Sequence, residues 1–393
     1  VLLTAADGNW SVATGALGTD LGNNIKYAGA LTITGITGNT NETNALTDYT
    51  TAKTGATTNT LTASDTNWSI AASTLTTALG SGVRLTGDLT VTDVSSEAAA
   101  LTAYTDSNTG AATITLNASD TNWSIAAATL DTALTAKVLL VGSLTVTDIA
   151  NGAETAALTA YNTAKTGATT NTLTATDANW SVAATTLDTA LTAGVRLAGN
   201  LTVTGISTET NASTTYSKTN TGATNVLLTA SDNNWSVTAT NLNADISNSI
   251  KYAGALTVTG ISTETNVSTT YSKSNTGASS VVLEASDGTW SVEDGALNTD
   301  LDNDFKYLGD LTVTGIATGN KTAALTDYTT AKTGATTNTL TANDAWSLTK
   351  ATLDTALGAG VRFAGDLTVT SGISDEASAL TAYTKSITGA DTN

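Results

Sequence analysis

Seven tryptophan residues divide the chain into a regular array. They recur about every 56 residues, each in a block related to Asp-x-Asn-Trp-Ser. Such a period is typical of repeat architectures, in which each unit buries its apolar face against its neighbours. We therefore predict one continuous array, 1–393, of seven repeats: 1–59, 60–114, 115–171, 172–226, 227–281, 282–338 and 339–393. The tryptophans are Trp10, Trp68, Trp123, Trp180, Trp235, Trp290 and Trp346.

A shorter period lies inside each repeat. Glycines close successive segments at a spacing of about half a repeat, and the series departs from Gly at Lys137. Each repeat therefore holds two coils, each expected to read strand, turn, strand and helical return. The glycines of the series are Gly55, Gly82, Gly110, Gly167, Gly194 and Gly222.

The first coil of a repeat predicts a strand, the Trp block and a short helix. In the fourth repeat Thr172-Leu173-Thr174-Ala175 alternates as a strand does, and Leu187, Ala190 and Leu191 share one helical face. Ser follows every Trp, where a helix N-cap is expected. These residues are Ser11, Ser69, Ser124, Ser181, Ser236, Ser291 and Ser347. The helix should end in a left-handed residue at Asn24, Gly82, Gly194, Asp304 or Gly360, while Lys137 and Ser249 suit that place less well.

The second coil predicts an alternating strand, Leu201-Thr202-Val203-Thr204, and then a return. In the third repeat Ala157, Leu158, Tyr161 and Ala164 suit one helical face that closes at Gly167. The equivalent returns, 212–222 and 267–277, are so rich in Thr and Ser that a helix is doubtful there.

These parts predict a parallel β-solenoid with short helical returns and about two coils per repeat. The alternative is a string of seven small β-domains. One repeat is small for an independent core, and no proline or linker separates the units, so we favour the solenoid.

Composition excludes several functions. The net charge of −19 repels nucleic acid, no run of about 18 apolar residues predicts a membrane span, and the absence of Cys removes disulfides and thiolate metal sites. The chain also lacks His, so both the common catalytic base and the thiolate nucleophile are missing. A catalytic pair should occur once, whereas the acidic positions here recur. We predict that the protein is not an enzyme.

An acidic residue precedes each Trp and has two interpretations. The first is a turn residue that accepts hydrogen bonds from nearby backbone amides. The second is a ligand to Ca²⁺, aided by neighbouring Asn side chains and carbonyls, and calcium is the one cofactor that we consider. The candidate ligands are Asp7, Asp65, Asp120, Asp177, Asp232, Asp287 and Asp344.

Other recurring side chains also have more than one interpretation. The Trp row suits a packed internal spine better than a sugar-stacking surface. Thr-x-Thr pairs such as Thr202/Thr204 resemble ice-binding solenoids, although Asn117 and Glu284 interrupt the other set of strands. The basic residue that six of the second strands carry is expected to pair with a carboxylate such as Asp188 or Asp300. These residues are Lys26, Arg84, Arg196, Lys251, Lys306 and Arg362.

The two ends of the printed chain match one internal stretch. Thr388-Gly389-Ala390 repeats residues 221–223, and Val1-Leu2-Leu3-Thr4-Ala5 repeats residues 226–230. An open solenoid edge normally needs a polar cap. We expect both strand edges to be completed by more of the same structure, either in a longer repeat protein or by subunits stacked end to end.

The sequence cadence resembles one group of proteins. Leu-Thr-Val-Thr-Gly-Ile, Ala-Thr-Thr-Leu-Asp-Thr-Ala-Leu and Thr-Gly-Ala-Thr-Thr-Asn-Thr-Leu-Thr look like the long Thr-, Ala- and Gly-rich repeat proteins of bacterial surfaces: cyanobacterial-type S-layer, adhesin and extracellular fibre proteins. The resemblance implies a secreted, acidic structural protein, often associated with Ca²⁺, and transfers no functional residue. We expect a self-assembling fibre or surface-layer component of the cell exterior. The alternatives are an adhesin stalk or a surface that binds polysaccharide and, more remotely, an ice-binding solenoid.

Overall fold

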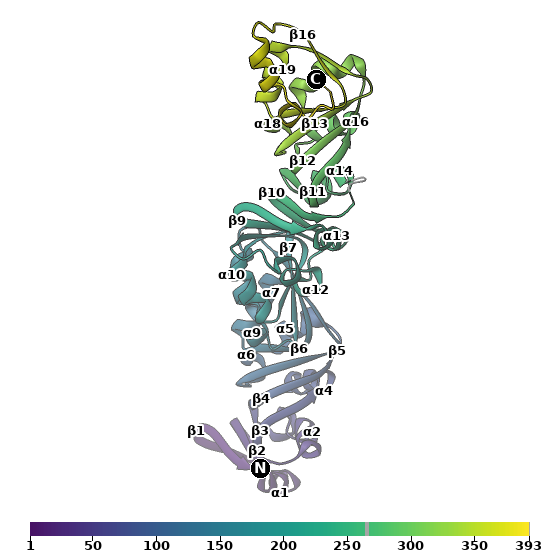
Figure 1. Cartoon of the computed structure of the whole chain (residues 1–393). Helices are drawn as coiled ribbons and strands as arrows, with labels where there is room; N and C mark the ends of the chain where they lie inside the picture. Colours follow the sequence, from purple (N-terminus) through teal and green to yellow (C-terminus); the bar gives the residue numbers. More distant parts are fainter. Residues whose placement is uncertain (264–266, 393) are drawn as a thin grey trace. The chain divides into compact units, whose positions relative to one another are not determined.

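A computed structural model describes residues 1–263 and 267–392 of the chain (Figure 1). Its backbone forms one sheet of 14 parallel strands arranged in sequence order, and two further strand segments of the seventh repeat form a separate two-stranded sheet. The predicted parallel β-solenoid is confirmed. The alternative of seven separate β-domains is wrong, because strands of successive repeats share one sheet. The chain groups into two compact units, one of residues 1–201 with 219–224 and the other of residues 202–218 with 225–393.

Each coil contributes one long strand to the sheet. The first strand of a repeat is longer than the second, as β3 is longer than β4, except in the seventh repeat, where both strands are broken. The strands are β1 Leu2–Ala13, β2 Lys26–Ile36, β3 Thr58–Ala71, β4 Val83–Val94, β5 Thr113–Ala126, β6 Val138–Ile149, β7 Thr170–Ala183, β8 Val195–Ile206, β9 Asn225–Thr238, β10 Ile250–Ile261, β11 Ser280–Glu293, β12 Phe305–Ile316, β13 Thr337–Ala342, β14 Trp346–Thr349, β15 Val361–Ala364 and β16 Leu367–Ser371.

The first coil of every repeat returns through a nine-residue helix. These helices are α1 Thr14–Gly22, α4 Ala72–Gly80, α7 Ala127–Thr135, α10 Ala184–Thr192, α13 Ala239–Ser247, α16 Asp294–Asp302 and α19 Lys350–Gly358. Each is followed by a residue with positive φ at the predicted place: Asn24, Gly82, Lys137, Gly194, Ser249, Asp304 and Gly360. Lys137 and Ser249, which suit this conformation less well, adopt it too, with φ of 58°. The fold therefore imposes the left-handed turn even where the local residue does not favour it.

The second coil returns through two short helices, not the single one expected across 157–167. In the third repeat the first helix stops at Ala160, Tyr161 has a non-helical φ of −110°, and a one-turn helix follows. The Thr- and Ser-rich returns at 212–222 and 267–277 keep both helices but shorten the first to one turn. The pairs are α2 Asn39–Asp48 with α3 Thr51–Thr54, α5 Glu97–Ala103 with α6 Asp106–Thr109, α8 Glu154–Ala160 with α9 Thr163–Thr166, α11 Ala212–Thr215 with α12 Lys218–Thr221, α14 Val267–Thr270 with α15 Lys273–Thr276, α17 Lys321–Asp327 (after the 3-10 turn η1 Thr318–Asn320) with α18 Thr330–Thr333, and α20 Glu376–Ala382 with α21 Lys385–Thr388.

Neighbouring strands are offset by half their length once in every repeat. The first half of β3 pairs with the first half of β4, as Asn59 with Val83, and the second halves pair as Trp68 with Leu89. Leu89 then pairs on its other side with Ile114, in the first half of β5. The second half of β5, with Trp123, therefore has β6 as its strand partner and presents its other edge to the return of the preceding coil.

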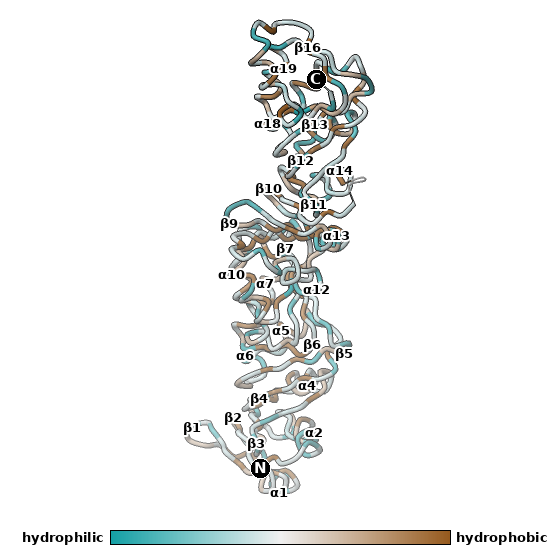
Figure 2. Tube along the Cα trace, viewed as in Figure 1, coloured by the Kyte–Doolittle hydropathy of each residue, from teal (hydrophilic) through white to brown (hydrophobic). Residues whose placement is uncertain are grey.

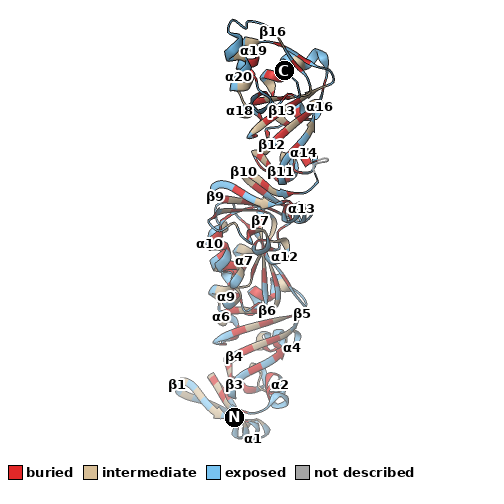
Figure 3. Ribbon diagram, in the orientation of Figure 1, coloured by how far each residue is buried: buried red, intermediate tan, exposed pale blue. Residues whose placement is uncertain are grey.

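The core follows the alternation that the sequence predicts. Inward positions such as Leu61, Leu116 and Leu173 are fully buried, and intervening residues face outward. Figures 2 and 3 show the same alternation as successive apolar and polar, or buried and exposed, positions along each strand. The Thr that precedes the closing Gly of each second coil is also buried and accepts a hydrogen bond from the amide two residues later, as Thr54 does from Ala56 at 3.2 Å.

Candidate functional site

The Asp of the repeated block forms a turn inside a strand. In six repeats its Oδ1 accepts a hydrogen bond from the backbone N–H two residues later, at 2.9–3.1 Å. The residue between them is left-handed, for example Thr66 with φ of 62°. These are Asp7, Asp65, Asp120, Asp177, Asp232 and Asp287, and the turn interpretation is confirmed for them.

The geometry supplies no ligand set for calcium. Within residues 1–263 and 267–392, no group of three or more acidic side chains gathers where it could hold an ion. Ca²⁺ sites in proteins usually use six to eight oxygen ligands. Calcium binding at the seven Asp residues therefore stays a prediction.

The backbone carbonyl of each turn packs closely against a glycine of the following strand. A β-carbon added to Gly87 would lie 2.1 Å from the carbonyl oxygen of Thr66, which no side chain could tolerate. The same close approach of 2.1–2.2 Å recurs at Gly29, Gly142, Gly199, Gly254 and Gly309. At this place in the strand, as at Gly199, the glycine has a positive φ. The structure shows that its lack of a side chain admits the neighbouring coil.

The Trp side chain anchors the block to the same place. Six indole N–H groups donate to the carbonyl of the residue just before that glycine, at 2.9–3.1 Å, as Trp68 does to Thr86. All the rings except Trp10, which is half-buried, are 1–2% exposed. The predicted internal spine is confirmed, since buried indoles cannot stack on a sugar.

The seventh block lacks one residue, and the whole arrangement changes there. Asn343-Asp344-Ala345-Trp346 is one residue shorter than Ser64-Asp65-Thr66-Asn67-Trp68. The strand breaks into β13 and β14, and a β-carbon on Gly365 would meet nothing within 4 Å. Among the described residues the buried indole N–H of Trp346 has no hydrogen-bond partner. Asp344 instead forms an ion pair with Lys321, whose Nζ also donates to the Ala345 carbonyl at 2.6 Å.

The prediction that Ser after Trp caps a helix is wrong. Ser11, Ser69, Ser124, Ser181, Ser236, Ser291 and Ser347 lie within strands, and the helices start three residues later. Where the other edge of the strand is open, a carboxylate accepts the backbone N–H instead. Glu97 accepts from Ser124 at 2.7 Å, and Glu209 accepts from Ser236 at 3.1 Å. A Glu from the preceding coil thus closes the sheet edge that the half-strand offset leaves open.

The predicted ion pairs of the second strand are also wrong. The six basic residues Lys26, Arg84, Arg196, Lys251, Lys306 and Arg362 donate to backbone carbonyls near helix C-termini. Arg84 bonds the carbonyls of Leu79 and Val83, and Lys26 bonds that of Ala52. The helix carbonyls among them, such as that of Leu79, lie in the last turn, which carries the negative end of the helix dipole and attracts a cation. Asp300 accepts a hydrogen bond from Tyr307 instead.

Buried Tyr–Asp pairs occupy three repeats. The phenol of Tyr27, Tyr252 or Tyr307 donates to the Asp seven residues earlier, and each ring packs edge-on against a Trp with centroids 4.8–5.0 Å apart. Burial and the Asp20 hydrogen bond raise the pKa of Tyr27 to about 12. In the other repeats the Asp position is Ala and the Tyr position is Leu or Phe, as Ala78 with Leu85. The pair therefore changes as a unit.

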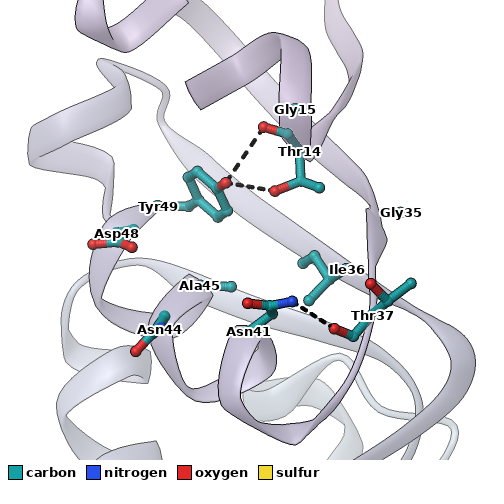
Figure 4. Close-up of a pocket in the computed structure, with 10 residues that line it drawn as sticks. All are labelled: Thr14, Gly15, Gly35, Ile36, Thr37, Asn41, Asn44, Ala45, Asp48 and Tyr49. Carbon is teal, nitrogen blue, oxygen red and sulfur yellow. Dashed lines mark hydrogen bonds between the residues drawn. The ribbon is translucent and has the colours of Figure 1, made fainter. Parts of the chain in front are cut away.

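Shallow grooves lie between the returns of neighbouring coils. Figure 4 shows one in the first repeat, where the Tyr49 hydroxyl and Thr14 Oγ1 are 2.5 Å apart and Asn41 donates to the Thr37 carbonyl at 2.8 Å. A larger groove in the fifth repeat is lined by Glu209, Asn241, Asp245 and Asn248. These groups are polar and uncharged or acidic, which suits hydroxyl-rich ligands better than anions.

The Thr-x-Thr pairs do not form an unbroken ladder. The outward row through β3 to β6 runs Ser69, Thr90, Thr115 and then Leu139. The half-strand offset ends each row after four strands. The structure thus gives no extended flat Thr surface along this row.

Comparisons with known proteins return no relatives: no family model, no curated protein and no solved structure matches the chain. In the part of the chain that the structure describes, no helix is long and apolar enough to cross a bilayer.

Proposed function

We propose that the protein is a structural component of the cell exterior, a fibre or surface layer built from coils that stack end to end. One observation carries the proposal. Leu380, in the last coil, is 79% exposed, whereas its equivalents Leu46, Leu101, Leu158 and Leu325 are 1–5% exposed. A large apolar side chain that is buried in the four other repeats that carry Leu at this position indicates a surface that another coil would cover.

Two further features support a structural role. Six of the seven Trp rings are buried internal anchors, so these six offer no face to a ligand. The charge of −19 is spread along the chain, which favours a hydrated, acidic exterior. Such a scaffold needs neither a catalytic centre nor a cofactor.

Negative-stain electron microscopy of the purified chain and of the native material tests this proposal. We expect filaments or a lattice with continuous solenoid density. Particles that stay single at high protein concentration, in both preparations, would contradict it.

A second candidate function is binding of a surface polysaccharide as an adhesin. The groove lined by Glu209 and residues of the fifth repeat favours it, because carboxylate and amide side chains line it beside the buried Asp245–Tyr252 pair. Titration calorimetry with surface polysaccharides should then show binding that Asn241→Ala weakens. Unchanged heats with that variant would remove this candidate.

A further inference from the structure

Inside the chain, the second half of a strand such as β4 pairs with the first half of the next strand, as Leu89 does with Ile114. We call this contact between coils a seam. The last coil and the first coil each carry one side of such a seam. We propose that a second copy of the chain docks on the C-terminal coil in the register of that seam, with Val1 of the incoming copy opposite Leu367. This inference rests on the proposed function and names its partner and its contacts. The partner that we propose for this surface is a second copy of the chain.

The backbone already sets the register at the C-terminal coil. Asp366 pairs in parallel with Thr392, and the Leu367 amide donates to the Thr392 carbonyl at 2.9 Å. Inside the chain the equivalent pair is Asp88 with Thr113, which continues as Leu89 with Ile114. The next strand is therefore started at Thr392 and has a defined continuation.

The N-terminal residues fit that continuation. Val1 occupies the strand position of Ile114 and Val226, and residues 1–5 repeat residues 226–230. Its backbone already makes the internal contact, since the Val1 amine donates to the Asn24 carbonyl at 2.8 Å as the Val226 amide does to Ser249 at 3.1 Å. The next rungs across the seam are then Leu367 with Val1, Thr368 with Leu2 and Val369 with Leu3.

One residue is duplicated at this junction. Asn393 follows Thr392 as Ile114 follows Thr113, so Asn393 and the incoming Val1 share one position of the repeat. Docking in this register gives the position to Val1. Deleting Asn393 should therefore leave association unchanged or strengthen it.

Apolar side chains that are buried at equivalent positions inside the chain are exposed on both end faces. Val1 is 81% exposed, against 0–1% for Ile114, Val226 and Val281. On the opposite face Leu380 is 79% and Ile373 41% exposed. Apolar side chains are thus exposed on both faces, and each face would cover the other when two copies dock. Burying these side chains drives association.

Residues for two polar contacts that join internal coils are also present in the last coil. Glu97 and Glu209 accept from the amide of a Ser in the next coil, and Glu376 holds the same place in the last coil. With Val1 in register, that amide is the one of Ser11. Similarly, Lys218 and Lys273 reach the left-handed residues Ser249 and Asp304. Lys385, which pairs with Asp391 at 2.9 Å in the single chain, holds the same place and would exchange that partner for Asn24 of the incoming copy.

Sedimentation velocity over a range of protein concentrations tests the docking face. We expect the chain to form a series of oligomers and Leu380→Asp to weaken association at least tenfold. The matched control is Leu308→Asp, which changes a 43% exposed apolar residue in an internal strand, away from the seam. Thermal melting monitors folding, which Leu380→Asp should leave intact because the side chain is exposed.

Disulfide trapping tests the register, since the chain has no cysteine of its own. Leu2→Cys combined with Thr368→Cys should give a ladder of covalent oligomers on non-reducing gels. Leu2→Cys with Thr370→Cys displaces the pair by two residues and should give at least fivefold less.

The outcomes separate this inference from the proposed function. Three outcomes would overturn the docking register and leave a structural role standing. Filaments would persist with Leu380→Asp, filaments would disappear when Asn393 is deleted, or both cysteine pairs would form disulfide-linked oligomers equally well. A chain that neither associates nor forms filaments would overturn both. Loss of association with Leu380→Asp alone, together with selective trapping through Thr368→Cys, supports the seam.

Discussion

The carbonyl oxygen of Thr66 lies directly over the α-carbon of Gly87, where a β-carbon would come within 2.1 Å of it. The left-handed turn at Thr66 directs this carbonyl toward the next strand, and the glycine admits it. The Trp68 indole bonds the residue just before that glycine. Turn, anchor and glycine together hold one coil on the next.

Replacing this glycine should therefore destabilise the stack. Gly87→Ala forces the coils apart, and we expect it to lower the free energy of unfolding by about 3 kcal/mol or more. Gly365→Ala is the matched control, because Gly365 also has a positive φ of 84° but faces open space. It should lose only about 1 kcal/mol, from backbone strain. Urea unfolding measures both, and equal losses would show that the contact with Thr66 is unimportant.

The indole hydrogen bond can be isolated by comparing two tryptophans. Trp68→Phe removes the bond to Thr86 and leaves that carbonyl without its indole partner, whereas Trp346→Phe has no such bond to lose. Because both rings are buried, the difference in stability reports the hydrogen bond. We expect Trp68→Phe to cost about 1–2 kcal/mol more in urea unfolding. A larger loss for Trp346→Phe would contradict this assignment.

Asn residues at two alternative positions satisfy the carbonyls at the end of the first return helix. Asn59 donates to the Tyr49 carbonyl at 2.5 Å, and Asn108 donates to the Ala103 carbonyl at 3.2 Å in the next repeat, where Ile114 takes the place of Asn59. Asn59→Ile should therefore cost about 1–3 kcal/mol by leaving a buried carbonyl unpaired.

Adding Lys53→Asn to that variant recreates the arrangement of the second repeat and should recover part of the loss, because Asn108 bonds the neighbouring carbonyls of Thr102 and Ala103 and not that of Tyr104. The exposed Lys53–Asp48 ion pair that disappears contributes little. Chemical denaturation of the two variants decides the matter. A double variant no more stable than Asn59→Ile would show that the two arrangements are not interchangeable.

The Asp245–Tyr252 pair should behave as a coupled unit. Asp245→Ala leaves the buried phenol without its carboxylate acceptor, while Asp245→Ala with Tyr252→Leu copies the Ala78/Leu85 arrangement. A double-mutant cycle of unfolding free energies should give a coupling of about 1–2 kcal/mol. Additive single losses would exclude the coupling.

Alkaline pH should destabilise the fold through its buried tyrosines. Burial, with the Asp20 hydrogen bond, raises the pKa of Tyr27 to about 12, and burial also raises that of Tyr252 and Tyr328. An unfolded Tyr ionises near pH 10, so the unfolded chain loses protons first as pH rises. Stability should be fully present below about pH 10 and fall between about pH 10 and 12. Melting temperatures across this range measure it, and a flat profile would contradict the burial of these phenols.

Part of this fold could be read from local pattern. The period of the tryptophans, the alternation around Leu201 and Val203, and the glycines that recur twice in each repeat predict two coils per repeat and a continuous solenoid. They succeed because strand alternation is a local pattern and because Gly and Asn, which favour a left-handed helix end, stand at several of these places. The exchange of Asn between the positions of Asn59 and Asn108 was visible as well, but its meaning needed the carbonyls that these side chains reach.

Other features were settled only by tertiary structure. The sequence alone determined the coil, its inward face and its turn residues. It could not show that Ser124 would meet Glu97, that Arg84 would bond helix carbonyls, or that Leu89 would pair with Ile114, because each contact joins residues from different elements or coils. The lateral register comes from burying all coils together, which leaves strand edges and helix ends open. Those exposed polar groups then select their partners in space.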